Sequence, residues 1–196
     1  EFDSASNDAI TLGNTIGNGF TQITCSIWAN ISTSGLTQST YRNFLVKFPG
    51  GTNYATPFEL RSSNGNRVDT YNNKLFFRVN TNTGSYGFTD TGFEFTEANK
   101  WHHLVGTYDG SNVKLFVDGV EYYSISASGT LNSNTNNATI GKFGSTGDFN
   151  GKLSNASIWN AALTSAQVTE LYNNGTPSNL SSHSATSNLV SWYKLN

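Results

Sequence analysis

Short runs of strand length recur along the 196-residue chain, and clusters of Gly, Asn and Ser separate them. These runs are AITLG, QITCSIWANI, NFLVKF, FELRSS, KLFFRVN, WHHLVGTY, VKLFVDG, VEYYSIS, NATIGKF and GKLSNASIW. Turn signals at intervals of roughly 8–12 residues are typical of antiparallel sandwiches and barrels. The pattern therefore predicts an all-β fold.

One segment, LTSAQVTELYNNG at 163–175, departs from this strand pattern. Thr164 is followed three residues later by Gln167, as in a capping box, and apolar residues then recur at helical spacing. The Asn and Gly residues at 173–175 are suited to end a helix in the left-handed conformation. We expect one short helix near 165–173, followed by a polar connector and a last strand, LVSWYKL.

The length and continuity of the chain favour one domain. A chain of 196 residues is long enough for one full core and short for two. Neither a Pro- or Gly-rich linker nor an internal repeat divides it, so we predict a single domain over residues 1–196. The sequence contains no methionine and begins with Glu1, which predicts a processed protein or a piece of a longer one.

The composition argues against several function classes. Charged residues make up 12% of the chain, against roughly 25% in typical globular proteins. The formal net charge is −2 and no run of Lys or Arg occurs, so we expect no nucleic-acid partner. No stretch approaches the roughly 20 apolar residues of a membrane span, so we expect no membrane insertion. Cys25, the single cysteine, is expected to be a small buried apolar side chain.

Two adjacent histidines in KWHHLVGTYDGSNVKLFVDG, residues 100–119, raise the question of a metal or catalytic site. Neighbouring side chains of a strand point to opposite faces, so His102 and His103 cannot both ligate one metal from this strand. The only other histidine, His183, lies in the polar connector, and none of the three has the spacing of zinc ligands. The Asp-Gly pair at 118–119 is a type I′ hairpin signal. The stretch therefore predicts a three-stranded meander.

The segment KWHHLVGTYDGSNVKLFVDGVE also resembles the central meander of laminin-G-like, concanavalin A-like jelly-roll domains, the superfamily of lectins and glucanases that includes the pentraxins. FDSASNDAITLGN, FTQITCSIWANIS, NATIGKF, DFNGKLSNASIWNAALTSAQVTELYNNG and LVSWYKL resemble further strands and the short helix of that family. The resemblance implies a two-sheet antiparallel jelly-roll sandwich with its terminal strand near the first. Because this architecture hosts lectins, adhesion modules, hydrolases and lyases, it does not by itself imply an activity.

Two enzyme patterns of the superfamily are incomplete in this sequence. The glucanases carry carboxylates at alternate strand positions, whereas Glu94 and Glu97 in FEFTEAN are three apart and would point to opposite faces of an unbroken strand. FELRSS resembles the Glu-Leu-Arg strand of jelly-roll alginate lyases, but their Gln-x-His and Tyr-x-Lys-x-x-x-Tyr elements are missing. We therefore interpret Glu59 and Arg61 as a cross-strand ion pair and expect a protein that is not an enzyme.

The resemblance also implies a structural or ligand-bridging Ca²⁺, which requires six to eight oxygen ligands. The candidate ligands lie in the loop before the first strand and in STGDFNG: Asp3, Asn7, Asp8, Asp148 and Asn150. The sequence departs from the family here, because KFGSTGD has one carboxylate and Ser154 and Asn155 follow where an acidic pair is common. The three residues of the first loop are equally suited to cap a turn through Asx-type hydrogen bonds, and both alternatives stay open.

Glycan sites stack sugar faces on exposed aromatic side chains and bind the hydroxyls with polar groups. The loop-rich stretch 41–95 offers such aromatics, and loops on a rigid sandwich often carry binding sites. The candidate ligand-binding residues are Tyr41, Tyr54, Tyr71, Tyr86 and Phe88.

The leading hypothesis is a non-catalytic recognition or adhesion module that acts outside the cell, secreted or on a virion surface. Its partners are expected to be glycans or cell-surface polysaccharide. The first alternative is a structural subunit of a virion or filament, which would contact copies of itself or a coat protein. The second is a polysaccharide hydrolase or lyase.

Overall fold

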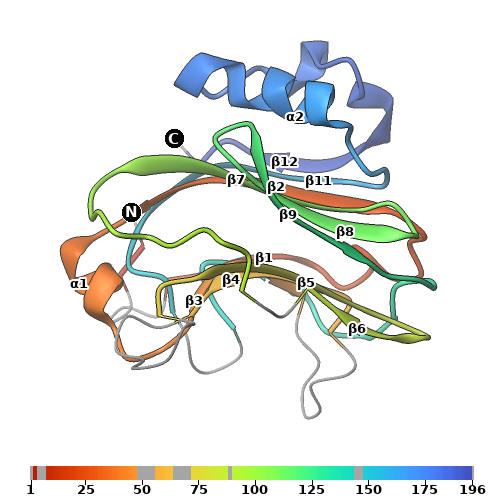
Figure 1. The fold of residues 1–196 in the computed structure, drawn as a ribbon, viewed down its shortest axis with the longest axis horizontal. Coiled ribbons are helices and arrows are strands. Elements are labelled where there is room, and N and C mark those ends of the chain that lie inside the picture. The colour runs from red at the N-terminus through yellow and green to blue at the C-terminus, as the bar shows by residue number, and fades with distance from the viewer. Residues whose placement is uncertain are drawn as a thin grey trace.

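The computed structural model describes residues 2–3, 8–47, 56–63, 72–87, 90–143 and 148–195, and within these ranges twelve strands are arranged in two sheets. Both sheets are six-stranded and antiparallel, and they pack face to face (Figure 1). The order in sheet A is β12 (Leu189–Tyr193), β11 (Gly151–Trp159), β2 (Ile23–Ile31), β7 (Trp101–Tyr108), β8 (Asn112–Val117) and β9 (Val120–Ser126). The order in sheet B is β1 (Ile10–Gly13), β10 (Ala138–Ile140), β3 (Arg42–Lys47), β4 (Phe58–Ser62), β5 (Leu75–Thr81) and β6 (Gly84–Tyr86). The predicted two-sheet antiparallel sandwich is confirmed.

The main core fills the space between the two sheets. Alternate residues of each strand point inward, as the period of two in the sequence predicts; in β2 these include Ile23, Cys25 and Ile27, all fully buried. Gly106 of β7 is required at its position, because a Cβ there would lie 2.0 Å from the Phe77 ring of the opposite sheet. Burial raises the pKa of the Cys25 thiol well above its usual value, as expected of a buried apolar side chain.

A second apolar cluster covers the outer face of sheet A. Helix α2 (Ser165–Tyr172) and the short turns η2 (Asn173–Gly175), η3 (Leu180–Ser182) and η4 (Thr186–Asn188) lie over this face, on the side away from sheet B (Figure 1). Their apolar side chains pack on Val105, Phe116 and Trp159. Thr164 and Gln167 form the predicted capping box at the N-terminus of α2.

A further short helix, α1 (Thr33–Thr37), has no signal in the sequence pattern described above. The Ser32 hydroxyl caps it by accepting a hydrogen bond from the Gly35 N–H at 2.9 Å. Within the described ranges, no helix has the length and apolarity that a membrane span requires.

The histidine segment forms the predicted meander of β7, β8 and β9. Asp118 and Gly119, at φ 51° and 80°, make the tight turn between β8 and β9. His102 packs edge-on against the core ring of Phe93 at 5.4 Å, whereas His103 lies on the outer face of sheet A. The two imidazoles therefore point to opposite faces, as predicted.

Candidate ligand-binding groove

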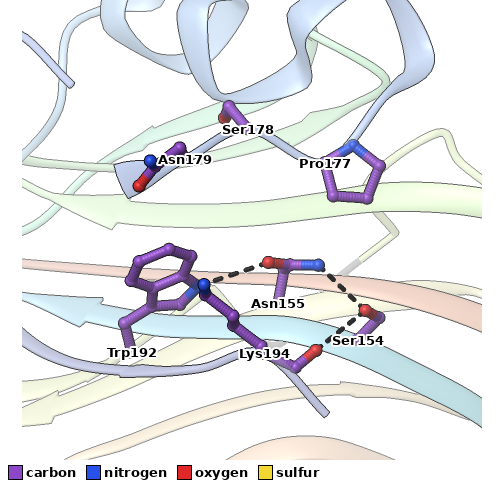
Figure 2. Close-up of a pocket in the computed structure, with 7 residues that line it drawn as sticks. All are labelled: Ser154, Asn155, Pro177, Ser178, Asn179, Trp192 and Lys194. Carbon is purple, nitrogen blue, oxygen red and sulfur yellow. Dashed lines mark hydrogen bonds between the residues drawn. The ribbon is translucent and has the colours of Figure 1, made fainter. Parts of the chain in front are cut away.

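A groove crosses the outer face of sheet A beneath the segment that follows α2. One part of it, about 360 Å³ in volume, is lined by Ser154, Asn155, Pro177, Ser178, Asn179, Trp192 and Lys194 (Figure 2). The adjoining part, about 300 Å³, is mainly apolar and is lined by Trp28, Trp101, Ser154, Gly175 and Pro177. Ser154 and Pro177 line both parts, so the two parts lie side by side, and together they are called the groove.

Strand pairing places the tryptophans on the floor of the groove. Trp28 of β2 lies between Ser154 of β11 and His103 of β7, and its neighbour on the same face, Asn30, is paired with Trp101. Trp192 reaches the same face from β12, and 42% of the Trp101 surface is exposed. The floor therefore carries three of the four tryptophans in the chain, contributed by three different strands.

Aromatic stacking holds Trp28 in a fixed orientation. Its ring is nearly parallel to the His103 ring, with centroids 5.0 Å apart, and to the Tyr172 ring of α2, at 5.8 Å. The His103 Nε2 atom lies 2.8 Å from the Ser26 hydroxyl, and burial lowers the pKa of His103 to about 3. A neutral imidazole therefore supports the indole at ordinary pH.

A β-bulge turns the Asn155 side chain into the groove. The register of β11 shifts between Ser154 and Ser157, and Asn155 adopts φ 47°. Trp192 Nε1 then donates to Asn155 Oδ1 at 3.2 Å, and Asn155 Nδ2 donates to the Ser154 hydroxyl at 2.9 Å (Figure 2). That hydroxyl donates in turn to the Lys194 carbonyl at 3.0 Å, so one chain of hydrogen bonds orients the polar floor.

The roof of the groove is anchored at both of its ends. On one side α2 ends at Asn173, which has left-handed φ and ψ angles. The Ser178 hydroxyl donates to the Leu171 carbonyl at 3.0 Å, and Leu180 is buried in the outer apolar cluster. Figure 2 shows the side chains of 177–179 facing Trp192 and Asn155 across the open space.

The groove is lined by aromatic, amide, hydroxyl and ammonium side chains. Flat indole faces alternate with amide and hydroxyl groups, and Lys194 Nζ lies 4.8 Å from the centre of the Trp192 ring. Among the described residues that line the groove there is no carboxylate, imidazole or thiol. Stacking and hydrogen bonding are therefore the interactions that these side chains offer to a ligand.

The family model described as the concanavalin A-like lectin/glucanases superfamily matches residues 3–169. The chain belongs to this superfamily. The resemblance seen in the sequence is thus confirmed. No curated protein matches the chain.

Solved structures show the same fold at low sequence identity. Domain 4 of AbnA, an extracellular GH43 arabinanase from Geobacillus stearothermophilus solved in complex with arabinotriose, is 19% identical with a TM-score of 0.63, and the match covers 84% of this chain and 72% of that one. The heptameric SAP-like pentraxin from Limulus polyphemus is 16% identical with a TM-score of 0.56, and the match covers 83% of this chain and 72% of the pentraxin. The enzymatically active domain of tailspike protein 2 from bacteriophage CBA120 is 13% identical with a TM-score of 0.70. The match covers 100% of this chain and 29% of that domain, so the chain spans under a third of it.

Of the five aromatic residues predicted to bind a ligand, the structure describes two, Tyr41 and Tyr86, and the aromatic site stays a prediction. Tyr54, Tyr71 and Phe88 lie outside the described ranges. Tyr41 precedes β3, whereas Tyr86 ends β6 and packs against the core, and β4 and β5 lie between these strands. Neither tyrosine lines the groove.

The Glu59 carboxylate forms a buried charge cluster on the outer face of sheet B. Arg61, two residues away on the same strand, binds it at 3.0 Å, and the cross-strand partner is Arg78 of β5. The predicted ion pair of Glu59 and Arg61 is therefore present, but it lies within β4 and does not cross strands. Burial lowers the pKa of Arg61, whose guanidinium stacks 4.4 Å from the centre of the Tyr41 ring.

A hydrogen bond joins the described residues at the two ends of the first loop proposed for Ca²⁺. The Asp3 N–H donates to Asp8 Oδ2 at 2.9 Å, which is the kind of bond that caps a turn. Asn7 lies outside the described residues. Phe2, which precedes Asp3, pairs with Gly151, which follows Asn150 of the second candidate loop.

The second loop is also engaged by protein groups. Asn150 Oδ1 accepts from the Ser32 hydroxyl at 2.6 Å, and Asp148 lies 3.9 Å from Lys142 Nζ. Within the ranges that the structure describes, no group of three or more His, Cys, Asp or Glu side chains could hold a metal ion. Calcium binding, which also uses amide and carbonyl oxygens, remains a prediction.

The expectation that Glu94 and Glu97 point to opposite faces is wrong. Both line a polar hollow of about 260 Å³ together with His102 and Asp118. The premise of an unbroken strand fails, because Glu94 makes only an isolated bridge and the following residues leave strand geometry.

The groups in this hollow are paired locally. Glu94 lies 3.5 Å from Lys74, and Glu97 lies 3.4 Å from Lys100. His102 Nδ1 lies 2.7 Å from one Asp118 oxygen, while the other accepts the backbone N–H of His103 at 2.8 Å. These contacts hold the end of the β7–β8 pair together.

Proposed function

We propose that this protein is a non-catalytic carbohydrate-binding module that acts outside the cell and holds a glycan in the groove on sheet A. The observation that carries the proposal is the line of Trp28, Trp101 and Trp192 beneath a polar roof. Most of the stacking surface comes from Trp101 and Trp192, because only 5% of Trp28 is exposed.

The groove is suited to a sugar for two physical reasons. The apolar C–H face of a pyranose or furanose ring stacks on an indole, while Asn155, Asn179 and the serine hydroxyls bind the ring substituents. The floor is also held in place before binding, since Trp28 packs against the nearly parallel rings of His103 and Tyr172 and Trp192 is hydrogen-bonded. Little side-chain entropy is then lost when the ligand enters.

The comparisons support the class of ligand. The arabinanase domain was solved with arabinotriose, and the family description includes lectins. These relatives share the fold at low identity, so the assignment of the groove rests on the side chains described above.

A glycan array followed by calorimetric titration tests the proposal. Trp101→Ala and Trp192→Ala should each weaken binding of the selected glycan by about tenfold, which corresponds to about 1.4 kcal/mol of lost stacking. Tyr122→Ala is the matched control, because Tyr122 is 46% exposed on β9 and does not line the groove. Binding that is indifferent to both tryptophans would show that the site lies elsewhere. Repeating the array with a chelator tests the calcium prediction.

One observation favours the structural-subunit alternative. Strand β9 is an edge of sheet A and exposes Val120, Tyr122 and Ile125 in a segment with a single charge, Glu121. Such an edge can pair with a strand of another chain. Analytical ultracentrifugation decides between the two functions: a stable assembly that binds no glycan on the array supports the subunit, and a glycan-binding monomer excludes it.

The enzyme alternative is tested by incubation with a polysaccharide panel. If the protein cleaves a polysaccharide and Glu59→Ala or His102→Gln abolishes this cleavage, the protein is an enzyme and the binding-module proposal is wrong.

A further inference from the structure

We infer that the groove selects glycans that carry negative charge, as carboxylate or sulfate, and that Lys194 and Lys152 recognise this charge. The inference rests on the proposed function and specifies the chemical class of its ligand. It comes from the distribution of ion pairs over the described part of the molecule.

Most cationic side chains already have partners. Arg67 lies outside the described ranges, and six of the ten described Lys and Arg residues lie within 4 Å of a carboxylate: Arg61, Lys74, Arg78, Lys100, Lys114 and Lys142. The side chains of two others are buried and donate hydrogen bonds to oxygen atoms of the protein. Arg42 donates to backbone carbonyls that include Gly35, and Lys47 donates to those of Asn14 and Ile16.

The remaining two lysines both lie beside the groove. Lys194 and Lys152 are exposed, and neither forms an ion pair with any described residue. In a chain of formal net charge −2, the two free ammonium groups thus share one face of one sheet.

Strand geometry places both lysines on the outer face of sheet A, at β11 and just after β12. Lys194 follows Trp192 by two residues and holds its ammonium over that ring. Lys152 precedes Ser154 by two residues on the same face of β11, and its cross-strand neighbour Asn30 is paired with Trp101. A saccharide stacked on Trp101 and Trp192 would cross β11 and β2 on this face, within reach of both lysine side chains.

The groove offers these charges no internal counter-ion. None of the described lining residues is acidic, so the local potential is positive although the whole chain is slightly negative. An anionic sugar substituent gains an ion pair with each lysine that it reaches. Pairs of this exposure contribute about a two- to fivefold gain in affinity each, and the gain falls as salt rises.

The test uses pairs of glycans that differ only in charge. Oligogalacturonate is compared with its methyl ester, and chondroitin sulfate with desulfated and carboxyl-reduced chondroitin, alongside the neutral and acidic members of the array. The charged member of a bound pair should bind more tightly, and sodium chloride should remove the difference. The carboxylate and sulfate pairs distinguish the two sources of charge.

Variants assign the effect to the lysines. Lys194→Met and Lys152→Met should each reduce the ratio of the affinity for the charged glycan to the affinity for its neutral counterpart about two- to fivefold, and Lys194→Arg should retain that ratio. Lys114→Met is the matched control, because Lys114 belongs to the same sheet, is paired with Glu121 at 3.0 Å and lies outside the groove.

The outcomes separate this inference from the proposed function. Equal binding of charged and neutral counterparts, binding confined to neutral glycans, or an equal loss in Lys114→Met overturns the charge selectivity and leaves a glycan-binding groove. Failure to bind any glycan overturns both.

Discussion

The buried His103 side chain should make the stability of this protein fall below neutral pH. Burial lowers the pKa of His103 from 6.5 to about 3 in the folded state, while the unfolded chain keeps the ordinary value. Between these two values the unfolded state binds a proton that the folded state does not. The free energy of unfolding therefore decreases as pH falls through 6.5, and above that pH the full stability is present.

The size of this effect follows from the two pKa values. At pH 5 the unfolded imidazole is almost fully protonated and the folded one is not, so the loss relative to pH 7 is about 2 kcal/mol. The nearby Asp118 carboxylate opposes the shift only in part, since burial is the larger influence on the pKa of His103.

Urea denaturation followed by tryptophan fluorescence at pH 7, 6 and 5 measures this difference. Other groups also titrate over this range, so the wild-type protein is compared with His103→Gln, which keeps a polar group near Ser26 but has no proton to gain. The variant should lose about 2 kcal/mol less stability than the wild type between pH 7 and 5. Equal losses in both proteins, or a folded-state imidazole that titrates near pH 6.5 by NMR, would refute the reasoning.

Three further substitutions test the packing. Gly106→Ala should destabilise the protein by about 3 kcal/mol, because the new methyl overlaps the Phe77 ring, and adding Phe77→Leu should recover part of this loss in urea titrations. Thr164→Ala should cost about 1 kcal/mol in the same measurement through loss of the α2 cap, with no further loss when Gln167→Ala is added. Asp118→Ala should cost about 2 kcal/mol and lower the hydrogen-exchange protection of the β7–β8 end, since it removes the acceptor of a backbone N–H; unchanged exchange there would contradict that role.

Local sequence signals predict most of the strands and helix α2. The capping box at Thr164, the Asp118-Gly119 turn and the opposite orientation of His102 and His103 each depend on a few adjacent residues. A period of two also fixes which residues of a strand enter the core. These features were predictable because each is determined by residues that are adjacent in the sequence.

The groove could not be predicted in the same way. Asn155 would alternate inward in a regular strand, and only the bulge between β11 and β2 turns its amide toward Trp192. Trp28 and Trp101 lie close together on the outer face only because of the register in which β2 pairs with β7. The prediction for Glu94 and Glu97 failed for a related reason, since it assumed a strand that the chain leaves after one bridge.

The groove joins a shared scaffold to a segment outside the family match. Trp28, Trp101 and Ser154 belong to strands within residues 3–169, which the superfamily model matches, whereas the roof at 175–179, Trp192 and Lys194 come after residue 169. Because the later segment packs its own apolar residues on sheet A through Leu180, it is held in place without a ligand. Change in this segment can therefore alter the lining of the groove while the sandwich stays the same, and the matched part of the chain alone does not determine the ligand proposed for it.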